Sequence, residues 1–223
     1  GSKVVLMDKD GERLTQTVEE FKAKGYDASG VIADLSELDS MNKAFDEAMV
    51  ILEDTLDVFI PAAGTISRID PWEVTFEQFE FIQKINLWHP YFMGQRAMKV
   101  MMAHPERGRG KIIFISSICV FRSGPRVSPY SCTKGAIFSL AKNWGNDLAM
   151  KNVNVNCICP GYINTQLISD IPADQRERSK TIPMERYAEP EDLKGLALFL
   201  GSAASDYITG ENIVIDGGFT NRL

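Results

Sequence analysis

The sequence predicts an α/β protein whose central, mostly parallel sheet is covered by helices on both faces, in a doubly wound, three-layer arrangement. Short apolar runs rich in β-branched residues alternate along the chain with segments of helical periodicity. Several of these runs are apolar throughout, as expected of parallel strands buried on both faces. No internal repeat, low-complexity tract or linker interrupts the order, so residues 1–223 are expected to form a single domain.

The short apolar runs are expected to be strands, because each is bounded by polar, glycine or proline residues. They are residues 3–7, 28–33, 56–60, 111–116, 153–158 and 212–215. The first two are followed by an acid, Asp8 and Asp34 respectively. The third must end at or before Pro61, because proline lacks the donor that a sheet ladder needs.

The segments with apolar residues at helical spacing are expected to be helices. They are residues 10–24, 36–52, 76–102, 129–150 and 190–200. Gly25 stops the first helix, Ser36 is the candidate N-cap of the second, and Pro90 should kink the third. Pro129 and Pro190 suit the first turns of the last two.

Composition and charge exclude several classes of protein. The net charge of -6 argues against a nucleic-acid surface, and no apolar run approaches the roughly 18 residues that span a bilayer. The four cysteines and two histidines fit no zinc template, so no metal site is expected. Cys157 and Cys159 lie in an apolar run and are interpreted as buried, reduced thiols of a cytoplasmic protein.

Tyr130 and Lys134 are the first candidates for chemistry. Residues four apart lie on the same face of a helix, and a nearby ammonium favours the phenolate and lowers the pKa of tyrosine. The pair could then exchange a proton with an alcohol or a carbonyl group. A tyrosine and a lysine at this spacing are also common by chance, and a pair on the surface of a helix is the alternative.

The surroundings of the pair decide between these interpretations. Ser117 precedes Tyr130 by 13 residues, and Asn86 lies inside an upstream helical segment. Three further motifs follow in order: Cys159-Pro160-Gly161-Tyr162-Ile163-Asn164-Thr165, Ile208-Thr209-Gly210-Glu211 and Asp216-Gly217-Gly218. In this order and spacing the chain resembles the classical short-chain dehydrogenase/reductase family over nearly its whole length. The resemblance implies a Rossmann-type fold and an NAD(H)-dependent oxidoreductase that acts on a secondary alcohol or ketone.

The resemblance also implies the roles of individual residues. Tyr130 is the expected catalytic acid/base, Lys134 lowers its pKa and holds the nicotinamide ribose, and Ser117 polarises the substrate oxygen. Asn86 is the expected fourth catalytic member, which holds a water in the proton relay. Asn86, Tyr130 and Lys134 are also expected to contact the cofactor. The remaining cofactor contacts are expected at Asp8, Asp34, Leu35, Ala63, Gly64, Pro160, Gly161, Ile163 and Thr165.

The choice of cofactor depends on Asp8. In dinucleotide-binding folds, an acid at this point accepts hydrogen bonds from the adenosine ribose and repels a 2′-phosphate, so NAD is expected rather than NADP. Lys9 weakens this rejection slightly. Asp34 and Leu35 match the family's contact with the adenine edge, although either acid could instead serve as a charge at a helix N-terminus.

The sequence departs from the family in two places. Pro61 stands where the family has the first asparagine of Asn-Asn-Ala-Gly. The family's glycine-rich phosphate-binding loop is missing, and the chain starts where the family's second strand starts. Because the family's first strand is central, we expect the natural protein to have an upstream strand, loop and helix. Gly1-Ser2 is either an expression remnant or the native step before that second strand.

The sequence says little about the substrate. Residues 164–182 match the family's substrate lid, and Arg122 and Arg126 lie between Ser117 and Tyr130. These arginines could hold an anionic substrate or be solvated surface residues. The family commonly forms homotetramers, or else dimers, and the same is expected here. The competing hypothesis is a non-catalytic binding or scaffold protein that has lost its cofactor loop.

Overall fold

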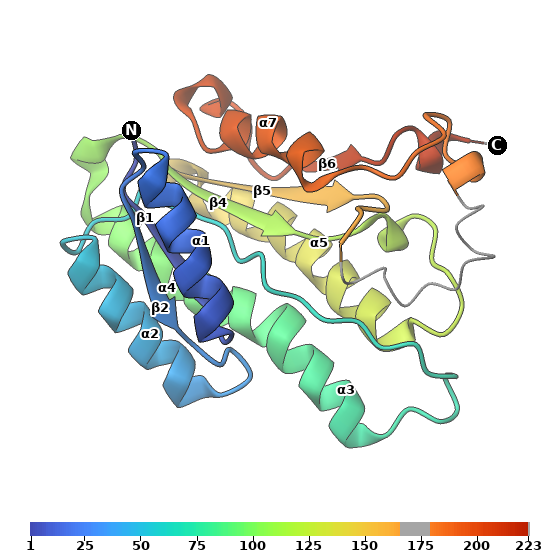
Figure 1. Ribbon diagram of the computed structural model, residues 1–223. Coiled ribbons are helices and arrows are strands. Elements are labelled where there is room, and N and C mark those ends of the chain that lie inside the picture. The colour runs from blue at the N-terminus through green and yellow to red at the C-terminus, as the bar shows by residue number, and fades with distance from the viewer. Residues whose placement is uncertain (166–178, 223) are drawn as a thin grey trace.

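The computed structural model describes residues 1–165 and 179–222 and has the α/β architecture that the sequence predicts (Figure 1). All paired strands are parallel. The strands of the described residues are β1 (Val4–Asp8), β2 (Ala28–Ile32), β3 (Val58–Phe59), β4 (Gly110–Ile115), β5 (Val153–Pro160) and β6 (Asn212–Ile215). The main helices are α1 (Gly11–Ala23), α2 (Leu38–Ile51), α3 (Phe76–Gln83), α4 (His89–Ala103), α5 (Ser128–Leu148) and α7 (Pro190–Leu200).

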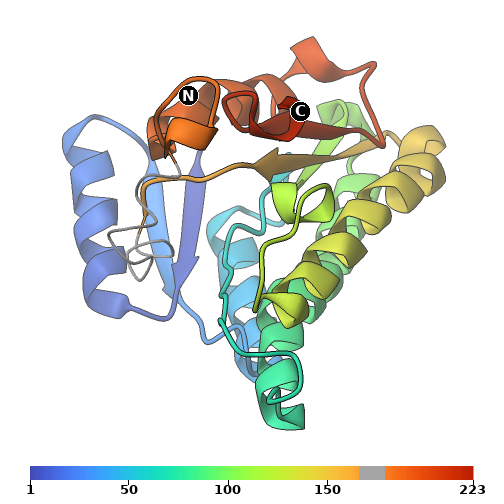
Figure 2. The same ribbon diagram turned by 90° about the vertical axis from the view of Figure 1, so that its right-hand side faces the viewer.

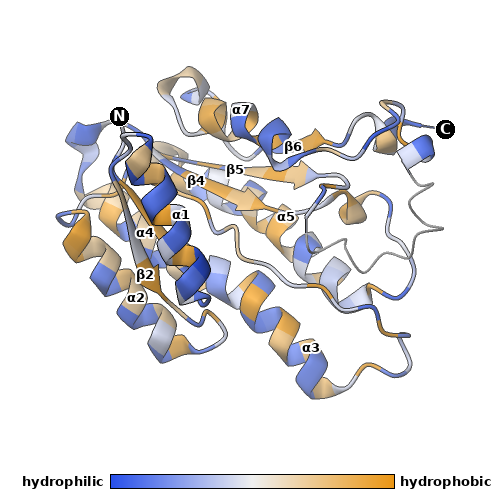
Figure 3. Cartoon of the chain, viewed as in Figure 1, coloured by the Kyte–Doolittle hydropathy of each residue, from blue (hydrophilic) through white to orange (hydrophobic). Residues whose placement is uncertain are grey.

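Successive residues of the strands pack against helices on opposite faces, which gives three layers. Ile112 and Phe114 of β4 join the core formed with α4 and α5, whereas Ile113 packs against α7. On β2, Val31 faces α2, and the bare backbone of Gly30 faces Leu14 of α1. In Figure 3 strands β4 and β5 are largely hydrophobic, while the helices also carry hydrophilic residues. The three-layer, doubly wound fold class is therefore confirmed.

The strands of the described residues form two separate sheets. β1 pairs with β2, and the larger sheet has the order β3-β4-β5-β6. Figure 2 shows β1, β2 and α1 at one end of the molecule. Arg96 of α4 links the two parts, because it pairs with Asp46 of α2 and lies 4.4 Å from the centre of the Phe45 ring. The strand that the family resemblance implies between β1 and β3 stays a prediction.

The helix expected over residues 76–102 is interrupted by a π-helix at Lys84–Trp88, between α3 and α4. Thr75 begins α3 with a capping box, in which its side chain accepts from Gln78 N. Pro90 lies in the first turn of α4, so the disturbance precedes the proline. Proline has no N–H for the carbonyl four residues earlier, and the wider π turn accommodates this loss.

Two other expectations at element ends were wrong. The N-cap of α2 is Glu37 rather than Ser36, because the Ser36 hydroxyl donates instead to Asp34 Oδ1 at 2.6 Å. β3 has two residues rather than the five expected, and within the described ranges it pairs with β4 alone. It does end before Pro61, as predicted. β5 extends to Pro160 because it pairs with strands on both sides.

Candidate active site

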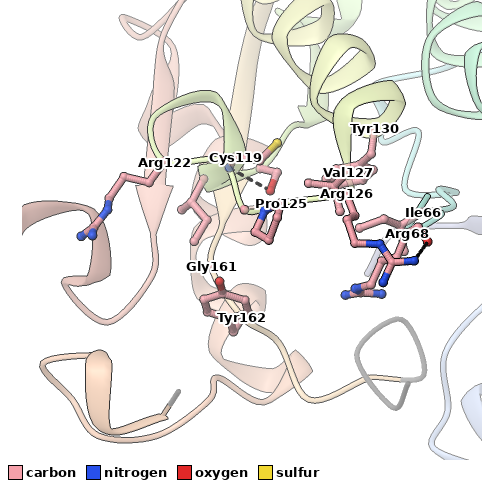
Figure 4. A pocket seen from close by; sticks show the side chains of 13 residues that line it. Ile66, Arg68, Cys119, Arg122, Pro125, Arg126, Val127, Tyr130, Gly161 and Tyr162 are labelled. Atoms are coloured by element: carbon pink, nitrogen blue, oxygen red, sulfur yellow. Dashed lines mark hydrogen bonds between the residues drawn. The ribbon is translucent and has the colours of Figure 1, made fainter. Parts of the chain in front are cut away.

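The candidate active site lies at the carboxyl ends of the parallel strands β4 and β5. Ser117 follows β4, and Tyr130 and Lys134 occupy the first turns of α5. The buried Ser116 hydroxyl donates to Lys134 O at 2.8 Å and so fixes the start of α5 against the end of β4. Ser117 and Tyr130 line one cavity of about 200 Å³ (Figure 4).

Lys134 is buried beneath the tyrosine. Its side chain lies with Nζ 5.7 Å from the centre of the Tyr130 ring and donates to Ile115 O at 2.8 Å. Burial lowers the pKa of Lys134 to about 8, because the charged ammonium is taken out of water. Its charge is therefore sensitive to pH near neutrality.

The pKa of Tyr130 moves in the opposite direction from the one that the sequence predicts. Burial raises it to about 12, and hydrogen bonding with the Ser117 side chain offsets only part of this shift. The ammonium of Lys134 does not offset this burial: it donates to Ile115 O, and its Nζ lies 5.7 Å from the centre of the ring. Tyr130 therefore keeps its proton at neutral pH in this form of the protein.

Asn86 joins three segments of the site. Its side chain is 1% exposed, and its Oδ1 accepts from Thr65 N while its Nδ2 donates to Thr65 O, both at 2.8 Å. The Nδ2 atom also lies 3.3 Å from Thr133 Oγ1, and this hydroxyl donates to Tyr130 O at 2.7 Å. Pro90, four residues further on, has no N–H for the Asn86 carbonyl. The sequence did not single out Thr65 or Thr133, although each adjoins a motif residue.

His89 is a second buried group near Lys134. It is 4% exposed at the start of α4. Burial, with the charge of Lys134 as a smaller cause, lowers the pKa of His89 to about 4, and hydrogen bonding with the Ile85 backbone opposes this shift only in part. The imidazole is therefore neutral at physiological pH.

The residues expected to hold the nicotinamide end of a dinucleotide lie around Lys134. A Cβ added to Gly64 would lie 3.6 Å from Asn86 Oδ1 and 3.8 Å from Lys134 Nζ, so the bare glycine leaves an approach to both groups. Within the described ranges, the ammonium of Lys134 gives one hydrogen bond, to Ile115 O, and an ammonium has three donors. The remaining donors suit the hydroxyls of a ribose.

The residues expected at the adenosine end differ in what their side chains already contact. Asp8 ends β1 in an exposed position, and its Oδ1 accepts from Asp10 N at 3.0 Å. Asp34 accepts from the amide and the hydroxyl of Ser36, which lowers its pKa, so it already stabilises a local turn. Leu35 packs against the core formed by β2 and α2. Asp8 is therefore the better placed of the two acids for a ribose.

The segment after β5 runs beside the cavity. Gly161 lines the cavity and donates through its amide to Ile215 O at 2.9 Å. A Cβ on Gly161 would come within 2.7 Å of Asp216 Cβ, so a side chain cannot be accommodated there without movement. Ile163 pairs with Ala188. Pro160, at the end of β5, and Ala63 and Thr165 are also in the described residues, whereas most of the expected lid, residues 166–178, lies outside them.

The four thiols are divided between the core, the cavity and the surface. Cys157 and Cys159 are fully buried, as predicted, whereas Cys132 is exposed and Cys119 lines the cavity. Among the residues that the structure describes, no cluster of three or more metal-binding side chains occurs. Over the same residues, no helix combines the length and the apolar character that crossing a membrane requires.

The comparisons with known proteins agree on the family. The model of a family described as enoyl-(acyl carrier protein) reductase matches residues 1–220. The chain is 33% identical to 2-dehydro-3-deoxy-D-gluconate 5-dehydrogenase of Escherichia coli over 93% of this chain and 82% of that protein. It is 31% identical to gluconate 5-dehydrogenase of Gluconobacter oxydans, over 100% of this chain and 87% of the relative.

A solved structure is similar over the same range. The gluconate 5-dehydrogenase of Burkholderia cenocepacia, in complex with NADP and tartrate, superposes with a TM-score of 0.92 at 29% identity. The match covers 100% of this chain and 87% of that structure. From the motifs, the fold and these relatives, the chain belongs to the short-chain dehydrogenase/reductase family of oxidoreductases.

Proposed function

We propose that the protein transfers a hydride between NAD(H) and a secondary alcohol or ketone, with Tyr130 as the acid/base. The observation that carries the proposal is the meeting of the Ser117 and Tyr130 side chains in one cavity, with the ammonium of Lys134 buried beside them. A bound nicotinamide would supply or accept the hydride. The chain supplies the proton and the hydrogen bonds at the substrate oxygen.

In the reductive direction the proton comes from the phenol of Tyr130. With a pKa of about 12, the phenol is protonated at neutral pH and can donate to the oxygen of a ketone as negative charge develops there. Ser117 would donate a hydrogen bond to the same oxygen and stabilise that charge. Alcohol oxidation reverses these steps and requires the pKa of Tyr130 to fall when a positive charge is bound nearby. Asn86 would hold the π-helix, the segment at Thr65 and α5 in a fixed arrangement.

The preference for NAD is part of the proposal and rests on Asp8. Its exposed carboxylate at the end of β1 would accept hydrogen bonds from the ribose hydroxyls and repel a 2′-phosphate. The relative from Burkholderia cenocepacia holds NADP, and Lys9 adjoins Asp8 in this chain. Both cofactors should therefore be assayed. The names of the relatives make small sugar acids the first substrates to assay.

We also propose a homotetramer, or a homodimer, that acts in the cytoplasm. Phe79, Trp88 and Phe92 are 38–44% exposed along α3, the π-helix and α4, which is consistent with an apolar helix interface. The four cysteines are unpaired, as is usual in a reducing compartment. Light scattering on the full chain would measure the assembly, and a mass of one chain would contradict it.

The catalytic proposal is tested by Tyr130→Phe, with Tyr207→Phe as the control at a fully exposed tyrosine. We expect Tyr130→Phe to lower turnover by about 10²–10⁴-fold, since general acid/base catalysis is lost, while NADH affinity measured by fluorescence stays unchanged. Turnover close to that of the wild type would overturn the role of Tyr130. A wild type that binds NADH but turns over no alcohol or ketone in a broad panel would favour the binding-protein hypothesis.

A further inference from the structure

Three arginines line the cavity beside Tyr130, and they differ in what their side chains do: Arg68, Arg122 and Arg126. The Arg122 guanidinium donates to Phe219 O and Arg222 O, both at 3.2 Å, and lies 4.9 Å from the centre of the Phe219 ring. Figure 4 shows Arg122 extending away from Tyr130. Its role is to hold the C-terminal segment.

Arg126, just before α5, bonds to the segment of residues 68–70. Its Nε lies 3.2 Å from Asp70 Oδ1, its Nη2 donates to Arg68 O at 3.4 Å, and its own carbonyl accepts from Ile69 N at 2.9 Å. Its backbone has a φ of 64°, in the left-handed region that few arginines adopt. The charge of Arg126 is compensated by Asp70, and its backbone and side chain both fix the segment that carries Arg68.

Arg68 has no such partner. Within residues 1–165 and 179–222, its guanidinium makes no hydrogen bond and no ion pair, while its carbonyl and the next amide are held by Arg126. In Figure 4 the side chains of Arg68 and Arg126 lie next to one another near Ile66. Asp70 forms its ion pair with Arg126, and among the described residues no carboxylate pairs with Arg68, so the positive charge of Arg68 at the cavity wall is not balanced.

We propose that Arg68 binds the carboxylate of an acidic hydroxy or keto substrate whose reacting carbon lies at Ser117 and Tyr130. This inference rests on the proposed function of the same site. The planar fork of a guanidinium matches a carboxylate with two parallel hydrogen bonds. The one positive charge of Arg68 balances a monoanion, whereas a phosphate ester carries about −1.5 to −2 charges at neutral pH. The cavity of about 200 Å³ fits a small substrate.

The contact between Arg68 and the substrate carboxylate should affect substrate binding more than turnover. Arg68 would contact a part of the substrate that does not react, so its hydrogen bonds are equally strong in the ground state and the transition state. Loss of those bonds raises KM and leaves kcat nearly unchanged. A charged hydrogen bond of this kind corresponds to about 10- to 100-fold in kcat/KM.

The experiment compares D-gluconate with its uncharged amide, D-gluconamide, and with 6-phosphogluconate, using wild type, Arg68→Gln, Arg68→Lys and Arg122→Gln. Arg122→Gln removes the same charge from the same cavity and should leave the ratio of acid to amide unchanged. We expect the wild type to prefer the acid, Arg68→Gln to lose about 10- to 100-fold in kcat/KM for the acid alone, and Arg68→Lys to recover part of it. Equal losses on acid and amide, no loss, or a stronger Arg68 dependence for the phosphate group would overturn the proposal.

A binding experiment distinguishes a failure of this proposal from a failure of the proposed function. Calorimetric titration of gluconate and gluconamide into Tyr130→Phe and into Tyr130→Phe/Arg68→Gln needs no turnover. Binding of the acid that depends on Arg68, without turnover in the wild type, would keep the anion site and reject the reaction. Turnover of neutral alcohols, with acid binding that is unaffected by Arg68→Gln, would keep the reaction and reject the anion site.

Discussion

Replacing His89 with leucine should remove much of the protein's sensitivity to mild acid. The unfolded chain takes up a proton at the ordinary pKa of 6.5, whereas the buried imidazole does so only at about 4. The unfolded state therefore binds more protons between these values, and stability is full above pH 6.5 and falls as the pH drops toward 4. The whole difference corresponds to about 3.4 kcal/mol, and roughly 2 kcal/mol of it is lost by pH 5.

The measurement is the free energy of unfolding in urea, followed by tryptophan fluorescence at one protein concentration at pH 7.5 and 5.0. We expect the wild type to lose about 2 kcal/mol more than His89→Leu between the two values, because the variant has no imidazole at this place. The packing cost of the substitution is present at both values and cancels. His104→Gln is the control, since it removes the only other histidine, which is partly exposed. Parallel losses in the wild type and His89→Leu would refute the reasoning.

Two further predictions test the cofactor site and the packing of α5. Asp8→Ser should lower the ratio of NAD to NADP in kcat/KM by about 10- to 100-fold, because a charged hydrogen-bond acceptor is removed, and a wild type that already prefers NADP would contradict the role of Asp8. Gly145→Ala should destabilise the protein by about 3 kcal/mol or more, because its Cβ would lie 2.4 Å from the backbone of Gly210. Gly135→Ala in the same helix has open space around it and should instead stabilise by up to ~1 kcal/mol; equal urea midpoints for the two variants would contradict the packing argument.

Most of the fold follows from local patterns in the sequence. α7 and β6 have the bounds expected from periodicity and flanking residues, and Asp10, the first residue of the expected helix, is the N-cap of α1, where its side chain accepts from Arg13 N. Errors arose where a distant or competing partner decides the structure. Ser36 bonds to Asp34 instead of capping α2, and β3 is short because pairing depends on which strands lie beside it.

The candidate site could be predicted only in part from the sequence. Motif spacing brings Ser117, Tyr130 and Lys134 together, but it gives neither the burial of the phenol, which raises the pKa of Tyr130, nor the hydrogen bond from Lys134 to Ile115 O. Arg68 lies in no motif. Its place at the cavity depends on a hydrogen bond from Arg126 Nη2 to Arg68 O, between residues 58 apart in the chain.

The separation in the sequence between Asp8 and Lys134 bears on how the protein opens when a cofactor is bound. Asp8 ends β1, and Lys134 lies in the first turns of α5. Amide hydrogens of a native protein exchange through local and subglobal openings, whose free energies differ between parts of a structure. A dinucleotide that reaches from Asp8 to Lys134 would have to leave before either contact region opens, and at a hundred times its Kd it would raise the free energy of those openings by about 2.7 kcal/mol. Bound cofactor should therefore slow amide exchange in β1 and in the start of α5 together.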